Sequence, residues 1–172
     1  MEPQYAVVAL PALAGADSVE AVRRRLDPLA ALLAAHVTLV FPFRDGLSEA
    51  SLADHVGRAV EGIPPFALAL TGLSVETGGY LFLDVGAGAE RFHDLHARLY
   101  SGPLARHRSS AHEYRPHVTV GRLVDHQGVA EARQEAYLAL RFPVLGTVPG
   151  LAIFRLDGPD RGAIVCRVPF DA

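Results

Sequence analysis

The chain carries one tetrapeptide pattern twice, as HVTL at residues 36–39 and as HVTV at residues 117–120. Both copies read histidine, apolar, threonine, apolar. Side chains alternate between the two faces of a β-strand, so each copy places its histidine and threonine on one face. Its two apolar residues then face a core. Two such strands side by side would bring two imidazoles and two hydroxyls together, and we expect this arrangement.

The elements predicted around the two tetrapeptides follow one order in both halves of the chain. Apolar spacing indicates the helices and β-leaning apolar runs indicate the strands. The first half reads strand, helix, strand, helix, strand, over residues 5–10, 17–33, 36–43, 48–61 and 66–76. The second half repeats this order and adds a hairpin, over residues 80–85, 89–104, 116–124, 128–140, 142–148, 151–156 and 163–170. The first helix contains Pro28, which is expected to kink or break it.

This internal repeat predicts an α+β protein built from a duplicated βαβαβ unit. We expect two lobes with mainly antiparallel sheets, related by a pseudo-twofold axis, within a single bilobal domain over residues 1–172. The repeats cover about 5–76 and about 80–170. The axis would bring the two histidine-containing strands together in a central groove, and ligands favour such interfaces.

Composition limits the kinds of ligand that the protein can bind and the cellular compartment in which it is expected. The net charge of −3 argues against a strongly basic nucleic-acid binder, whereas a small anionic ligand in a locally basic cleft fits. Cys166 is the single cysteine, so no disulfide within the chain is possible and a reducing compartment fits. No signal-peptide pattern opens the sequence, and no apolar run reaches the ~20 residues that span a bilayer. We expect a cytoplasmic monomer that does not bind membranes.

The residue types of the repeated motif suit phosphodiester chemistry. Imidazole titrates near pH 6.5, so one histidine can be neutral while the other is protonated. The neutral one can take a proton from water or a ribose hydroxyl, and the cationic one can protonate the leaving oxygen. The threonine hydroxyls can donate to the phosphate oxygens in the transition state. The candidate catalytic residues are therefore His36, Thr38, His117 and Thr119, and the near-symmetry leaves open which histidine is the acid.

The stretches HVTLVFPF at residues 36–43 and RPHVTVG at residues 115–121 resemble motifs of the 2H phosphoesterase superfamily. Within it, they are most similar to the bacterial 2′-5′ RNA ligase and cyclic phosphodiesterase group. The resemblance implies hydrolysis or transfer at 2′,3′-cyclic phosphates or 2′-5′ linkages of nucleotides or RNA ends. It also implies that the two histidines and two threonines form the site, with no metal and no other cofactor.

Other residues near the motifs are weaker candidates. Arg115 lies two residues before His117, so strand geometry puts both on one face, where the arginine could hold a phosphate. Tyr114 and Phe41 could stack on a base. His93 and His96 are spaced to share a metal on a helix, but no third ligand follows at a recognisable spacing, so we interpret them as a solvated helix face. Three arginines are expected mainly on the polar side of the first helix, at residues 23–25.

Three functions remain open from the sequence. The first is a metal-independent phosphoesterase. The second is a binding module that holds a nucleotide or an RNA terminus with the same four side chains and without turnover. The third is a zinc hydrolase that uses some of the histidines, and it would lose its activity in a chelator.

Overall fold

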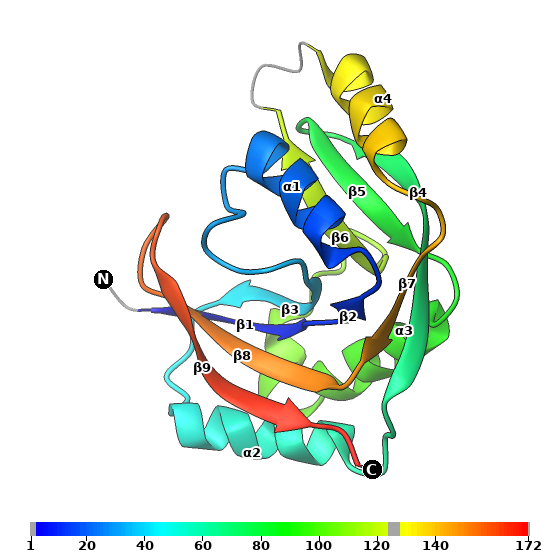
Figure 1. Cartoon of the computed structure of the whole chain (residues 1–172). Helices are drawn as coiled ribbons and strands as arrows, with labels where there is room; N and C mark the ends of the chain where they lie inside the picture. The colour runs from blue at the N-terminus through cyan, green and yellow to red at the C-terminus, as the bar shows by residue number, and fades with distance from the viewer. Residues whose placement is uncertain (1–2, 124–127, 172) are drawn as a thin grey trace.

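The computed structural model describes residues 3–123 and 128–171, whose strands form one nine-stranded, curled antiparallel sheet (Figure 1). The strand order across the sheet is β2-β7-β4-β5-β6-β3-β1-β8-β9. The strands run over β1 Gln4–Ala9, β2 Ala12–Leu13, β3 Val37–Phe43, β4 Phe66–Glu76, β5 Tyr80–Val85, β6 His117–Arg122, β7 Val144–Val148, β8 Gly150–Leu156 and β9 Gly162–Pro169. The predicted α+β class and antiparallel pairing are confirmed. Residue 124, the predicted end of the second motif strand, lies outside the described residues.

Helices pack against the sheet. They are α1 Ala16–Leu26, α2 Glu49–Val60, α3 Ala89–Leu99, α4 Val129–Ala139 and the short 3₁₀ helix η1 Gly102–His107. Ser48 caps α2, because its hydroxyl accepts a hydrogen bond from the amide of Ser51 at 3.1 Å. No helix in residues 3–123 and 128–171 has the length and apolar character needed to cross a membrane.

The predicted first helix, residues 17–33, is too long. α1 ends at Leu26, and residues 27–35 form turns instead. Pro28 is the physical reason, since a proline disfavours helical backbone at the residue before it and cannot donate an amide hydrogen bond. The turns place a loop, not a helix, directly before the first histidine.

The two motif strands, β3 and β6, lie side by side in the middle of the sheet. On the β6 side the sheet continues with β5 and β4, and on the β3 side with β1 and β8. α1 packs on β6, whereas α3 packs on β3 (Figure 1). The first helix of each repeat therefore covers the motif strand of the other repeat, and the two repeats are interleaved in space.

The alternation predicted for both tetrapeptides is confirmed. Four apolar residues of the motifs are fully buried, namely Val37, Leu39, Val118 and Val120. The histidine and threonine of each motif are only half-buried and face the opposite side of the sheet. The apolar side chains thus pack in the core on one face of the sheet, and the histidines and threonines lie on the other face.

Candidate active site

The loop before His36 is fixed by a buried arginine, Arg23 of α1. Its guanidinium donates to the carbonyl of Leu33 at 2.9 Å and forms ion pairs with Glu20 at 3.0 Å and Asp27 at 3.1 Å. Glu20 also accepts the amide of Ala35 at 2.6 Å. The prediction that residue 23 lies on the polar side of the helix is wrong, since the side chain is 1% exposed.

The register of the central pair brings the four motif side chains together. β3 and β6 pair antiparallel where residue 37 lies opposite residue 118. Antiparallel strands continue their register residue by residue, so His36 lies opposite Thr119 and Thr38 lies opposite His117. Each histidine therefore faces the threonine of the other motif, and the four residues form one cluster on one face, which we call the quartet.

Both imidazoles are oriented by the same kind of hydrogen bond. Nδ1 of His36 lies 2.8 Å from the carbonyl oxygen of Ala34, and Nδ1 of His117 lies 2.7 Å from that of Arg115. A carbonyl oxygen only accepts, so each Nδ1 carries a hydrogen and donates it. In the neutral ring, Nε2 then has a free lone pair. Each histidine can thus take up or give back one proton at Nε2.

The surroundings of His36 favour its neutral form. Burial is the main reason that the pKa of His36 lies below its usual value, and the positive charge of Arg23 lowers it further. The hydrogen bond to Ala34 and the carboxylate of Asp27 act in the opposite direction. His117 also lowers the pKa of His36, which places the two imidazoles within electrostatic reach of each other.

The surroundings of His117 differ, because two carboxylates lie near it. Burial again lowers its pKa, and the positive charge of Arg115 lowers it further. The hydrogen bond to the carbonyl of Arg115 and the carboxylates of Asp84 and Glu76 act in the opposite direction. Asp84 is its cross-strand partner on β5. The ring of Phe82 stacks on the imidazole, with 3.6 Å between centroids and 18° between planes. The imidazole of His117 therefore packs on Phe82 and has two carboxylates near it, whereas His36 has one, Asp27.

Arg115, predicted to hold a phosphate, lies on the same side of this cluster. Its guanidinium pairs with Glu76 and lies 3.6 Å from a carboxylate oxygen of Asp84. It also donates to the hydroxyl of Ser74 at 3.0 Å and lies over the ring of Phe82. An incoming phosphate would compete with these carboxylates for the arginine.

Tyr114, predicted to stack on a base, contacts the backbone of β3. Its hydroxyl donates to the carbonyl of Thr38 at 3.0 Å, and its ring stacks on His96 with 3.8 Å between centroids and 7° between planes. His96 itself donates from Nδ1 to the carbonyl of Leu39 at 2.9 Å. The prediction that His96 faces solvent is wrong, because this side chain is buried between α3 and β3. His93 is exposed and contacts the edge of Tyr114.

Phe41 lies further along β3, with its ring half exposed. Its backbone amide donates to the hydroxyl of Tyr100 at 3.1 Å. The side chains of Tyr114, His96 and Tyr100 thus hydrogen-bond to the backbone of β3 beyond the point where β6 pairs with it. Phe41 retains an accessible ring, as the prediction of a stacking residue requires.

A family model for the 2′-5′ RNA ligase superfamily matches residues 10–160. The chain belongs to this superfamily. A Geobacillus thermodenitrificans protein that is named as a phosphoesterase is 29% identical over 122 residues, which cover 69% of each chain. A second relative with a phosphoesterase name, from Geobacillus kaustophilus, is 29% identical over 125 residues, which again cover 69% of each chain.

Solved structures of other proteins share the fold. Escherichia coli LigT complexed with 3′-AMP is similar with a TM-score of 0.64 and 19% identity, over 99% of this chain and 100% of LigT. TT0787 of Thermus thermophilus has the same TM-score and identity, over 99% of this chain and 98% of that protein. These likenesses confirm the α+β fold that the internal repeat predicted.

For this member of the 2′-5′ RNA ligase superfamily, sequence reasoning missed the residues that support the quartet. Arg23 and His96 are buried partners of backbone carbonyls, and Phe82 and Asp84 lie next to His117. Within residues 3–123 and 128–171, no three His, Cys, Asp or Glu side chains are grouped so that they could hold a metal ion.

Proposed function

We propose that the protein is a metal-independent phosphoesterase that acts on a 2′,3′-cyclic phosphate or a 2′-5′ phosphodiester of nucleotides or RNA ends. The observation that carries this proposal is the quartet, in which two imidazoles with available Nε2 atoms lie beside two threonine hydroxyls on one face. General acid–base chemistry needs one group that takes a proton and one that gives a proton, and the quartet supplies both. The superfamily and the phosphoesterase names of the relatives support the same reaction class.

A nucleotide ligand is consistent with this proposal. LigT structures complexed with 3′-AMP, ATP and NADP⁺ share the fold of this chain. All three ligands carry phosphate on an adenosine. The chain's net charge of −3 makes long RNA less suitable than a small nucleotide or an RNA end, because few phosphates have to be neutralised.

In the proposed reaction His36 is the general base and His117 is the general acid. Nε2 of His36 takes a proton from water, whose oxygen attacks phosphorus. The bond between phosphorus and the ribose oxygen breaks, and Nε2–H of His117 gives its proton to that oxygen. The threonine hydroxyls donate to the non-bridging oxygens, where negative charge develops. Proton exchange with solvent then restores both rings.

This assignment of roles follows from the charges around the two rings. Arg23 lies within the electrostatic reach of His36 and disfavours a positive charge there. Arg115 acts on His117 in the same sense, but two carboxylates, Asp84 and Glu76, favour a positive charge on His117, whereas only Asp27 does so at His36. A bound phosphate adds negative charge beside both rings, so the protonated form of His117 becomes accessible in the complex.

A substrate panel tests the proposal. The protein is incubated in EDTA with nucleoside 2′,3′-cyclic phosphates, with short RNAs that bear cyclic ends, and with 2′-5′ linked dinucleotides. We expect at least one class to be hydrolysed in the chelator. Loss of activity in EDTA would favour a zinc hydrolase, and binding of all three classes without turnover would favour a binding module.

A further inference from the structure

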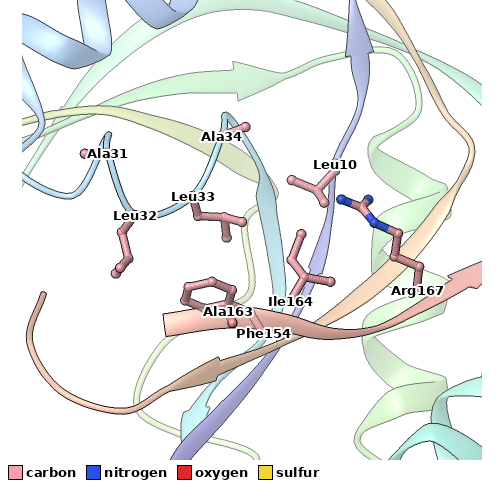
Figure 2. A pocket seen from close by; sticks show the side chains of 9 residues that line it. All are labelled: Leu10, Ala31, Leu32, Leu33, Ala34, Phe154, Ala163, Ile164 and Arg167. Carbon is pink, nitrogen blue, oxygen red and sulfur yellow. The ribbon is translucent and has the colours of Figure 1, made fainter. Parts of the chain in front are cut away.

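A pocket of about 440 Å³ lies beside the quartet, between residues 31–34 of the loop and the β8–β9 hairpin. Figure 2 shows Leu33 above the pocket, Phe154 and Ile164 below it, and Leu10 and Arg167 at one side. Its lining otherwise consists of alanines and another leucine. The loop that forms its upper wall is the segment that Arg23 fixes, and it leads directly into His36.

The register of the sheet puts this pocket on the face that carries the quartet. Thr38 lies opposite Val8 on β1, Val8 lies opposite Ala152 on β8, and Ala152 lies opposite Arg167 on β9. Residues opposite each other in paired strands point to the same face. Arg167 is therefore three strand spacings from Thr38, about 14 Å between backbones, with two small buried side chains between them.

Arg167 is the one charged residue in the lining of this pocket. Its side chain is exposed, and in the described part of the chain it has neither a hydrogen bond nor an ion pair. Its guanidinium turns towards Leu10 (Figure 2). Leu10 follows Ala9, which pairs with Val37, so Leu10 lies next to His36. A guanidinium without a carboxylate partner thus points along the sheet towards the quartet.

We propose, on the basis of the function above, that this pocket binds the nucleoside whose phosphate is hydrolysed and that Arg167 binds the phosphate on the 5′ side of that nucleoside. Apolar walls can cover the face of any base, and no lining side chain other than Arg167 can hydrogen-bond to a base edge. The pocket is therefore tolerant of base identity. The guanidinium fits phosphate geometry and charge, and it has no carboxylate to give up.

The proposal makes the second phosphate a determinant of affinity. Adenosine 3′-monophosphate and adenosine 3′,5′-bisphosphate differ only in that group, and both can be titrated without turnover. We expect the wild-type protein to bind the bisphosphate about tenfold to a hundredfold more tightly, as expected for hydrogen bonds to a charged group. Arg167→Ala should remove this preference and leave the affinity for the monophosphate within about twofold.

A matched control is Arg141→Ala. Arg141 is also exposed and makes no hydrogen bond or ion pair with the described residues, and it lies between α4 and β7 in the other half of the sheet. This variant should keep the full preference for the bisphosphate. Equal affinities of the wild-type protein for the two nucleotides, or an unchanged preference in Arg167→Ala, would overturn the proposal.

Filling the pocket tests its apolar part separately. Ala163→Trp adds an indole at the lower wall, at a position that is exposed on β9. We expect weaker binding of adenosine 3′-monophosphate and unchanged binding of inorganic phosphate, which needs only the quartet. Unchanged nucleotide binding in this variant would place the base elsewhere.

The subsite and the reaction can fail independently. An Arg167-dependent preference for the bisphosphate without hydrolysis of any cyclic phosphate would remove the proposed function and keep the subsite. Hydrolysis of cyclic phosphates without such a preference would keep the proposed function and remove the subsite.

Discussion

The hydroxyl of Tyr114 donates a hydrogen bond of 3.0 Å to the backbone carbonyl of Thr38. Tyr114 lies three residues before His117, so this bond joins the segment that leads into the second motif to the first motif. β3 and β6 pair directly at one position only among the described residues. The side-chain bond therefore helps to set the spacing of the quartet. Burial raises the pKa of Tyr114, so its hydroxyl keeps the proton that it donates.

Tyr114→Phe tests this relationship. The ring can still stack on His96, but the carbonyl of Thr38 loses its donor. We expect kcat to fall about tenfold with little change in KM, and the free energy of unfolding to fall by about 1–3 kcal/mol. Steady-state kinetics and urea unfolding measure the two effects.

The control for this change is Tyr137→Phe. Tyr137 stacks on Phe142, and its hydroxyl has no hydrogen bond within residues 3–123 and 128–171. This variant should match the wild-type protein. A wild-type kcat in Tyr114→Phe would show that the bond does not position the quartet.

Asp84→Asn tests the roles of the two histidines. The carboxylate of Asp84 raises the pKa of His117, so its removal lowers that pKa. With His117 as the acid, the alkaline limb of the kcat/KM profile should move to lower pH, because the acid loses its proton earlier. The limb set by His36 should stay in place. Movement of the acidic limb alone would show that His117 is the general base and His36 the general acid.

Arg23→Met tests the support of the loop before His36. The change leaves Asp27 buried without its cation and the carbonyl of Leu33 without its donor. We expect a loss of about 3–5 kcal/mol in the free energy of unfolding, as for other broken buried pairs. Arg24→Met, at an exposed neighbour without a partner in the described chain, should change it by less than about 0.5 kcal/mol. Equal effects of the two changes would contradict this account.

Stability should fall as the pH drops below about 6.5. Burial lowers the pKa of His36, His96 and His117 in the folded chain, whereas the unfolded chain keeps values near 6.5. Below that pH the unfolded state binds protons that the folded state does not, so unfolding becomes easier. Urea unfolding between pH 8 and pH 5 measures the decline. A His117→Asn variant should show a shallower decline, and a flat curve in the wild-type protein would refute the interpretation.

The local sequence pattern was sufficient to predict much of the fold. The predicted bounds of β4 and β5 agree with the structure, because the glycines at 78 and 79 supply the positive φ values of 88° and 76° that their turn requires. The alternation of the two motifs was enough to place the quartet on one face. The short strand β2 was not predicted, since two residues carry no periodic signal.

The missed supports depend on partners far along the chain. Arg23 is buried because a loop carbonyl and two carboxylates surround its guanidinium, and no helical spacing reveals the loop carbonyl. His96 did carry a signal, since it lies at helical spacing within the apolar stripe of Phe92 and Leu99. The prediction that His96 faces solvent rested on the polarity of histidine, although its position in the helix indicated burial.

The most direct test of the central claim is the turnover of a 2′,3′-cyclic phosphate substrate by His36→Ala and by His117→Ala, compared with the wild-type protein and with His112→Ala. His112 is exposed and has no partner in the described residues, so its replacement should leave turnover unchanged. Each change in the quartet should lower turnover by about 10²–10⁴-fold while the far-UV circular dichroism stays that of the wild type. Wild-type turnover in both quartet variants would contradict the central claim.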